Sequence, residues 1–533
     1  MAVAKQKIHT ASNESHQGSN ILIKNLIADE LIFAVVGPAG SGTSWITEAL
    51  KQRLSTAIEA EVIILKASDA IFNWASSNKF IIKEKNRLER AKSLQDAGDK
   101  IRKSDPAGVA VSLISEIKKS RTTAEQDPPS VSPSKKTRVY ILDSLKHPAE
   151  VSLLRAVYQE AFCLIGVVCE TKTRKSRLRD EKCNSSTSTE IDLFIARDED
   201  SGLTYGQKVA DTFHLADFFV DNSPNRFLDD EKKQENRDWD VNDQLGRLID
   251  ILTHKKVIRP TPSETGMFHA YGAQMSSACL SRQVGAALMD KSGNLVSTGT
   301  NEVPSAGGGV YGSNFSTQSE TPPQDHRCAI TNKYCSSNKH QDIIINELIS
   351  TIPELKKVQF TKLKEQLKKT GIGRLLEFSR AVHAEMDALL SAARKGTSPV
   401  GGRLFVTTFP CHYCARHIVS SGIDEVQYIE PYPKSLALTL HGDAIAQTKS
   451  SWNAPSEMLA TLGEGHPKVL FRPFTGVAPR LYKRAFIKSR KLKNNEGTMQ
   501  FHDPDWASGL LRISYKEIEN RLLENLASAP NEE

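Results

Sequence analysis

Two short stretches of the chain hold side chains that bind metal ions and move protons. The first is His383-Ala384-Glu385, and the second is Pro410-Cys411-His412-Tyr413-Cys414. One imidazole and two thiolates give three ligands to Zn²⁺, which prefers four ligands in a tetrahedron. The fourth position can hold a water molecule, whose pKa the metal lowers towards neutrality. The spacing therefore predicts a zinc site formed by His383, Cys411 and Cys414.

Glu385 is the residue expected to move protons at this site. It stands two positions after His383, too close in sequence and too differently aimed on a helix to be an obvious fourth ligand. A carboxylate in this place can take a proton from a zinc-bound water and pass it to a leaving amine. The complete pattern, H-x-E followed by P-C-x-x-C, is typical of zinc-dependent deaminases.

Two helices are expected to position these side chains. The first is predicted over 382–394, with one apolar face that anchors it, formed by Val382, Met386, Leu389 and Ala393. The second is predicted over 411–421, before Gly422, and its dipole would stabilise the thiolates at its start. We expect the other elements of this half to be a helix over 267–281, a hairpin over 283–301 and the strands LFVTTF and EVQYIEP.

A structural zinc site, or a set of unrelated buried residues, is the alternative interpretation. The CxxC pair alone leaves the two interpretations about even. A structural site normally uses four protein ligands and needs neither the adjacent glutamate nor the preceding proline. The complete pattern and the order of strands and helices therefore favour catalysis.

Residues from about 262 to 440 resemble the cytidine and deoxycytidylate deaminase family, and most closely its deoxycytidylate branch. Besides the two motifs above, the stretches SRQVGA (281–286) and TNEVP (300–304) carry this resemblance. It implies an α/β/α deaminase fold and a contact between Asn301 and the sugar of the substrate, whereas a turn cap is the plain structural role for Asn301. One departure is Asp387, where many deoxycytidylate deaminases carry asparagine, and it bears on the base and sugar contacts.

Candidate phosphate-binding groups follow the zinc motif. Lys434 and Ser435 come just after the strand that follows it, and Arg282 and Arg480 are the next candidates. A solvated surface charge is the equally good alternative for each of them. The long polar insertion over 305–380 holds His326, Cys328 and Cys335, which could form a second, structural zinc site with one more ligand; an ordinary loop is the more common outcome.

The first half of the chain has a different pattern. Five short apolar runs end in polar or glycine residues and are separated by longer segments of helical spacing, which predicts a doubly wound parallel sheet: LIFAVVG, EVIILKAS, RVYILDS, FCLIGVVCE and ADFFVDN. The interval over 122–136 is rich in proline and serine and is expected to be a surface loop.

A glycine-rich stretch directly follows the first of these runs and opens a helix. Its sequence is Gly37-Pro38-Ala39-Gly40-Ser41-Gly42-Thr43-Ser44, the context in which a P-loop binds phosphates with backbone N–H groups. Thr43 stands where the P-loop lysine would be. Ser44 and the Walker-B-like Asp143 remain as magnesium ligands. We expect nucleotide and Mg²⁺ binding without efficient phosphoryl transfer. A glycine-rich turn without a ligand is the alternative.

Three arginines follow the FCLIGVVCE run, where nucleotide kinases often carry a lid: Arg174, Arg177 and Arg179. A plain basic loop explains them equally well. The whole arrangement, a P-loop NTPase or nucleotide-kinase-like half before a deaminase half, resembles the bacterial anti-phage deoxycytidylate deaminases, which deplete dCTP and dCMP during infection.

The length of 533 residues agrees with two domains and flexible ends. We predict a tail over 1–28, a P-loop domain over 29–224, a linker with a helix over 225–261, a deaminase domain over 262–490 and a tail over 491–533 with a helix near 515–526. The net charge of +7 is too mild to indicate a nucleic acid or membrane partner. Eight cysteines in so long a chain favour metal binding and a reducing cytoplasm over disulfides.

Three functions compete on this sequence. The first is a hydrolase that converts dCTP or dCMP to the deoxyuridine nucleotide with release of ammonia. The second is a deaminase that edits cytidine or adenosine in single-stranded DNA or tRNA, although no stripe of aromatic and basic residues supports it. The third is a P-loop sensor or phosphotransferase with a regulatory deaminase-like half. Related deaminases form oligomers, so a homo-oligomer is expected, and the arrangement leaves room for an unidentified activating or inhibitory factor.

Overall fold

The computed structural model describes residues 30–499 together with Glu519 and Leu523, with gaps at 59, 125–137, 183–187, 230–233, 237–238, 255, 313–324, 333, 376, 433, 450–451, 462–465 and 489–492. The predicted tails and the predicted loop over 122–136 fall mostly outside the described residues. Glu519 and Leu523 are both helical and lie within the range 515–526, where a helix is expected.

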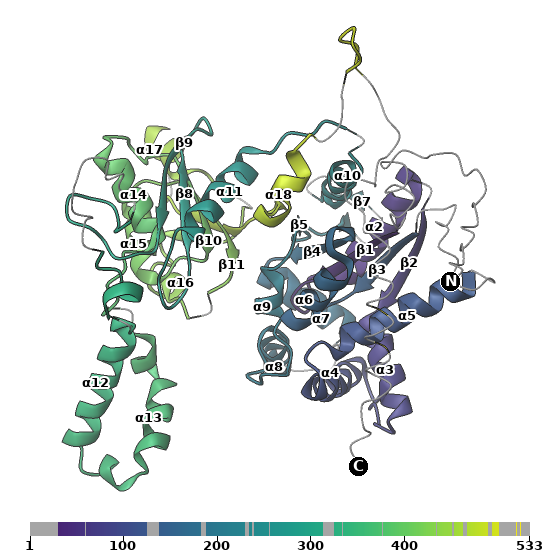
Figure 1. Cartoon of the computed structure of the whole chain (residues 1–533), viewed down its shortest axis with the longest axis horizontal. Coiled ribbons are helices and arrows are strands. Elements are labelled where there is room, and N and C mark those ends of the chain that lie inside the picture. Colours follow the sequence, from purple (N-terminus) through teal and green to yellow (C-terminus); the bar gives the residue numbers. More distant parts are fainter. Residues whose placement is uncertain are drawn as a thin grey trace, which may run out of the picture.

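The chain forms two α/β halves, each built on a mainly parallel sheet (Figure 1). The first sheet has the order β14-β5-β4-β1-β3-β2, and all neighbours are parallel except β14, which is antiparallel to β5. The five apolar runs of the first half form its parallel strands, as predicted. The strands are β1 (Glu30–Val36), β2 (Glu61–Lys66), β3 (Arg138–Asp143), β4 (Phe162–Val168), β5 (Phe218–Asp221) and β14 (Gly476–Val477).

Helices that follow these strands cover the first sheet and connect its strands. Where a strand is apolar on both faces, as β1 and β4 are, both faces are buried. The helices of this half are α2 (Thr43–Ile58), α3 (Ala67–Ser77), α4 (Arg87–Ser104), α5 (Gly108–Ala124), α6 (Pro148–Tyr158), α7 (Thr171–Lys182), α8 (Ser188–Glu199) and α9 (Val209–Phe213).

The segment predicted as a linker contributes to this half of the molecule. After a small hairpin, β6 (Phe227–Asp229) and β7 (Gln234–Glu235), it forms α10 (Val241–Leu252), whose apolar face packs against α2 and β5. Leu245, Leu248 and Leu252 are buried in the core of the first sheet. The helix of the predicted linker therefore packs as part of the first half of the molecule. The predicted domain boundaries stay a prediction.

The second sheet has the order β12-β13-β11-β10-β8-β9. β8 and β9 form the predicted antiparallel hairpin, with Gly293 in the turn at φ +82°, and β10, β11, β13 and β12 pair in parallel. The strands are β8 (Gly285–Met289), β9 (Leu295–Thr300), β10 (Arg403–Thr408), β11 (Glu425–Glu430), β12 (Ile445–Ala446) and β13 (Val469–Pro473).

Alternating side chains of the second sheet face two different helix layers. Ala287, Met289 and Phe405 pack on the side of α11 (Pro262–Met275), in one core with the first sheet. Leu288, Leu404 and Val406 pack on the other side with α14 (Ala384–Arg394) and α15 (His412–Ser420). Because neighbouring residues of a strand point to opposite faces, the two helix layers lie on opposite faces of the sheet. The second half is thus the expected α/β/α arrangement.

The predicted helix over 267–281 is displaced towards the N-terminus. α11 begins at Pro262, because Thr261 and Glu264 form a capping box and proline is favoured at the first helical position, and it ends at Met275. Glu264 also accepts a hydrogen bond from Val477 N–H at 2.8 Å and two from Arg247, so it ties α11 to α10 and to β14.

The long insertion contains two helices that project from the second half (Figure 1). α12 (Ser336–Thr351) and α13 (Phe360–Lys368) pack on one another through a small core of Ile345, Ile349 and Leu363. Among the described residues, the other α-helices are the short α16 (Ala437–Leu440), α17 (Pro455–Thr461) and α18 (Pro479–Phe486). Within the described ranges, no helix is long and apolar enough to cross a membrane.

Candidate metal centre and glycine loop

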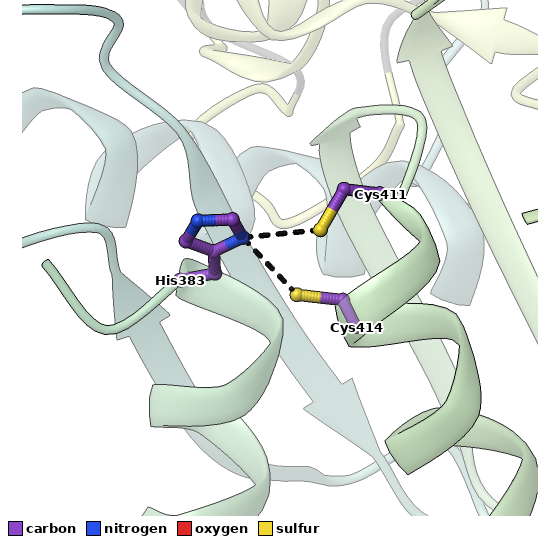
Figure 2. A group of neighbouring side chains, drawn as sticks. All are labelled: His383, Cys411 and Cys414. Carbon is purple, nitrogen blue, oxygen red and sulfur yellow. Dashed lines mark hydrogen bonds between the residues drawn. The ribbon is translucent and has the colours of Figure 1, made fainter. Parts of the chain in front are cut away.

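The three predicted zinc ligands lie together where two helices begin. His383 is the N-cap of α14, Cys411 is the N-cap of α15, and Cys414 lies in the first turn of α15. His383 Nδ1 is 3.3 Å from the sulfur of Cys411 and 3.4 Å from that of Cys414, so the ring faces both cysteines (Figure 2). Among the described residues, this is the group of metal-binding side chains whose donor atoms all lie within 4.8 Å of one another.

The spacing of these donor atoms fits one zinc ion. Nitrogen and sulfur ligands at ordinary zinc distances in a tetrahedron lie about 3.6 Å apart, close to the two measured separations. Cys411 is 5% and Cys414 1% exposed, so little of either thiol faces solvent. The donor set, its spacing and its burial therefore match a zinc site with three protein ligands.

The side chains of His383, Cys411 and Cys414 change one another's pKa values. Its hydrogen bond with Cys411 raises the pKa of His383 to about 9. Hydrogen bonds from Cys414 and His383 lower the pKa of Cys411 to about 4, against the effect of burial. The hydrogen bond to Cys411 and burial hold the pKa of Cys414 well above its usual range. Cys411 and His383 thus each favour the charged form of the other.

Glu385 lies beside this group but outside it. It is 4% exposed, and burial raises the pKa of its carboxyl group to about 7, with the negative charge of Cys411 adding to the effect. Glu385, His383 and Cys411 line the same cavity of about 540 Å³. The site therefore combines metal-binding side chains with one buried carboxyl group.

The apolar face predicted for this helix is wrong in part. The buried positions of α14 are dominated by Ala384, Ala388 and Ala392, while Ala393 is exposed and Met386 is half-buried. Small residues are needed because α14 packs closely on β9: a Cβ at Gly299 would lie 2.2 Å from the Ala384 carbonyl oxygen.

Asp387 and Asn301 both hold the backbone around the cavity. Asp387 Oδ2 accepts a hydrogen bond from Thr300 N–H at 3.1 Å, and burial raises the pKa of Asp387. Asn301 lines the cavity, but its Oδ1 accepts from Val284 N–H at 2.6 Å and its Nδ2 donates to the Arg282 carbonyl at 2.5 Å. Asn301 thus has the turn-capping role. Its contact with the substrate sugar stays a prediction, and the second hydrogen on Nδ2 is the group that would make it.

The predicted phosphate-binding residues are placed differently from one another. Lys434 lines the cavity and is exposed, and Arg282 lines it while paired with Glu430 at 3.1 Å. Ser435 is not among the lining residues; its hydroxyl donates to the Pro410 carbonyl at 2.8 Å and supports the zinc motif. Arg480 lines a different cavity, beside Arg155 and Arg484.

The residues suggested for a second zinc site do not assemble. Cys328 and Cys335 line the large cavity, whereas His326 is not among its lining residues. Cys335 is the N-cap of α12, with Ser281 Oγ 3.5 Å from its sulfur. In the part of the chain that the structure describes, these three residues do not form a group of metal ligands.

Sequence reasoning missed two carboxylates of the cavity, the buried Glu302 and the half-buried Glu430. Glu302 accepts hydrogen bonds from Ala278 and Val303 N–H, and Glu430 accepts one from Thr408 Oγ1 at 3.1 Å. Glu430 ends β11 beside the end of β10, where the carboxyl edge of a parallel sheet commonly forms a binding site. Its place at the end of a predicted parallel strand could have marked Glu430 as a residue of the binding site.

The glycine-rich stretch forms a tight loop between β1 and α2. Gly40 and Gly42 have φ values of +81° and +82°, and a Cβ on Gly42 would lie 2.5 Å from Asn222 Nδ2. Only glycine fits there, because both the backbone angle and the space exclude a side chain. The loop carries the helix start of α2, and Ser44 Oγ donates to Asp143 Oδ2 at 2.7 Å. The two predicted magnesium ligands, Ser44 and Asp143, thus lie together, whereas Thr43 offers no cation.

Two of the three predicted lid arginines contact this loop. Arg174 Nε donates to the Ala39 carbonyl at 3.1 Å, and Arg177 Nη1 lies 3.5 Å from the Ser41 carbonyl oxygen. Arg179 is exposed and lies near Ser188. The first two arginines are buried parts of the loop's surroundings rather than an open lid.

Comparison with known proteins identifies the family of the second half. Residues 261–430 match the model of the cytidine and deoxycytidylate deaminase zinc-binding region. The chain is 33% identical over 168 residues to the deoxycytidylate deaminase of Enterobacteria phage T2, covering 31% of this chain and 78% of the relative. It belongs to the cytidine and deoxycytidylate deaminase family.

Two further phage proteins are similar to this chain. The deaminase is 31% identical over 169 residues to the deoxycytidylate deaminase of Enterobacteria phage T4, covering 31% of this chain and 76% of that relative. The apo dCMP deaminase of cyanophage S-TIM5 aligns with 41% of this chain and 100% of its own length at 19% identity, with a TM-score of 0.20, too low to support any argument. Family membership makes the chain a hydrolytic deaminase. The zinc-binding region and the His/Cys/Cys group together support Zn²⁺ as its metal.

Proposed function

We propose that this deaminase hydrolyses the 4-amino group of deoxycytidine nucleotides, dCMP or dCTP, and releases ammonia. One observation carries the proposal: His383 and Cys411, two members of the His383, Cys411 and Cys414 donor group, and the buried Glu385 line one cavity of a size for a nucleotide base and sugar. Relatives named deoxycytidylate deaminase support the choice of substrate class.

His383 Nδ1 and the sulfurs of Cys411 and Cys414 would hold the metal. When bound, zinc lowers the pKa of a coordinated water and so supplies a nucleophile near neutral pH. Glu385 would take one proton from the water as its oxygen bonds to C4 of cytosine and would pass that proton to N3. It would then take the remaining hydroxyl proton as C4=O forms and would donate it to the amine as the C–N bond breaks. The carboxyl group thereby returns to its starting state, and the products are the deoxyuridine nucleotide and ammonia.

The test uses purified, zinc-loaded protein with dCMP, dCTP and a cytosine-containing single-stranded oligonucleotide. We expect equal amounts of ammonia and deoxyuridine nucleotide from at least one free nucleotide, and none from Glu385→Ala at unchanged zinc content. A zinc-bound protein that deaminates neither free nucleotide would refute the proposal, and activity confined to the oligonucleotide would replace it with polynucleotide editing.

We further propose that the reaction serves anti-phage defence by depleting deoxycytidine nucleotides. The resemblance of the whole arrangement to bacterial anti-phage deaminases motivates this role. A homo-oligomer is proposed because related deaminases form oligomers. Nucleotide pools measured during infection of cells that express the wild type or Glu385→Ala test the role. A fall in dCTP and dCMP that also occurs with Glu385→Ala would contradict it. Sedimentation of the purified protein tests the oligomer.

A second proposal concerns the glycine loop, which we propose binds a nucleotide with Mg²⁺. The hydrogen bond between Ser44 and Asp143 favours it, because both groups are suited to a magnesium ion beside phosphates. Calorimetric titration with ATP in the presence and absence of Mg²⁺ tests it. Binding that is independent of Mg²⁺ would contradict a magnesium site at these two residues.

A further inference from the structure

A lysine from another part of the sheet lies at the glycine loop. Lys146 follows β3, and its Nζ donates to the Gly37 carbonyl at 3.2 Å, although the two residues are 109 positions apart. Its side chain is 19% exposed. Because Thr43 cannot neutralise a phosphate, Lys146 is placed to supply the positive charge that the loop sequence itself lacks.

The loop already binds an anion that belongs to the protein. Asp198, near the end of α8, accepts a hydrogen bond from Ala39 N–H at 2.7 Å and pairs with Lys146 Nζ at 3.0 Å. The Asp198 side chain is 3% exposed. The buried Asp198 carboxylate therefore contacts both Ala39 N–H and Lys146 Nζ. A backbone N–H group and a lysine ammonium group are two kinds of donor that bind phosphate oxygens.

Unpartnered polar atoms nearby indicate that the loop is built for more than this carboxylate. Ser41 Oγ has no hydrogen-bond partner among the described residues, and Ser41 is 1% exposed. Arg177 Nε is likewise unpartnered in a residue that is 8% exposed and whose guanidinium group lies over Trp45. Buried donors without partners cost free energy, and a polyphosphate would provide acceptors for both.

We propose that Lys146 is the phosphate-binding cation of the glycine loop and that Asp198 occupies the loop until the polyphosphate of a nucleoside triphosphate displaces it. The inference rests on the proposed nucleotide binding by this loop. On displacement, the Asp198 carboxylate leaves Ala39 N–H and Lys146, and phosphate oxygens take its place. The ligand must therefore compete with a charge that the protein supplies, which weakens its binding.

Titration calorimetry with ATP and Mg²⁺ tests this on the full-length chain. Asp198→Asn should bind ATP at least about tenfold more tightly than the wild type, since the competing charge is gone while an oxygen remains for Ala39 N–H. Lys146→Met should bind at least about tenfold more weakly. These magnitudes are those of one hydrogen bond to a charged group. Asp192→Asn on α8 and Lys51→Met on α2 change the same charges at more exposed positions and should bind as the wild type does.

The double variant Lys146→Met/Asp198→Asn keeps the local charge balanced and guards against misfolding of Lys146→Met. Because the two expected effects are opposite and of similar size, it should bind ATP about as the wild type does, and at least about tenfold more weakly than Asp198→Asn. Inorganic tripolyphosphate should show the same order of affinities, because only phosphate oxygens are involved. Wild-type binding that neither substitution changes would overturn the inference and leave nucleotide binding intact. No binding of ATP by the wild type or by Asp198→Asn would refute both.

Discussion

The metal centre in the second half of the molecule and the glycine loop in the first half occupy corresponding places. In each, a parallel strand ends, a short turn follows, and a helix begins: β10 leads to Cys411 and α15, and β1 leads to the glycine loop and α2. They differ in what the protein has placed there. Three donor atoms face one another at the metal centre, whereas Asp198 already pairs with the loop and Lys146. The metal centre would be completed by a metal ion, whereas on our proposal the glycine loop binds a ligand only after the Asp198 carboxylate has left it.

Removal of one metal ligand is the largest change expected at either place. Cys414→Ser should lose its zinc and its deaminase activity, because two ligands hold zinc far less tightly than three. Cys335→Ser is the matched control, since its thiol lines the same cavity outside the donor group. Metal analysis should find one zinc per wild-type chain and per Cys335→Ser chain. Two zinc ions in the wild type and one in Cys335→Ser would instead reveal a second site.

The proton carrier comes next. Glu385→Gln should lower kcat by about 10²- to 10⁴-fold, the usual contribution of general acid–base catalysis, because an amide cannot take a proton from water. Its zinc content should stay at the wild-type level, since Glu385 lies outside the donor group. Single-turnover kinetics with dCMP measures the effect. A variant that keeps its zinc and loses less than about tenfold in rate would assign the proton transfer to another group.

A smaller effect is expected where substrate phosphate would enter the cavity. Lys434→Met should raise KM for dCMP by about tenfold, the effect of losing one hydrogen bond to a charged group, with little change in kcat. Lys434 is exposed and lines the cavity, and deoxycytidine, which has no phosphate, is the control substrate. An equal rise in KM for deoxycytidine would mean that Lys434 shapes the cavity rather than binding phosphate.

The two places are joined by consecutive residues, which predicts coupling between them. Asp198 contacts the glycine loop, Glu199 pairs with Arg174 at 2.9 Å, and Asp200 lines the deaminase cavity. We expect saturating ATP with Mg²⁺ to change kcat/KM for dCMP by about fivefold, the low end of measured couplings.

Gly42→Val tests whether that coupling passes through the glycine loop. A valine there clashes with Asn222 and should abolish the response to ATP while leaving zinc in place. A response to ATP that persists in Gly42→Val would place the coupling elsewhere.

Local sequence patterns predicted many of the elements and helix starts at these two places, but not the contacts between residues far apart in the chain. The apolar runs and the helix starts are local features, so the five strands of the first sheet and the positions of His383 and Cys411 followed from spacing. Asp198 and Lys146 lie 159 and 109 residues from their partners in the glycine loop, and nothing in the neighbouring sequence marks either residue. The buried face of α14 was also misjudged, because close packing on β9 selects alanine over larger apolar residues.

The smallest effect is expected at Asp387, whose carboxylate lies near the metal centre. Asp387→Asn keeps an oxygen that can accept from Thr300 N–H, so kcat/KM for dCMP should change by less than about twofold. Asp387→Ala removes that acceptor, leaves a buried N–H unpaired and lets the end of β9 shift beside Asn301, so it should lower activity and thermal stability together. Equal losses in both variants would show that the charge of Asp387 matters, and that this carboxylate does more at the metal centre than hold the backbone of Thr300.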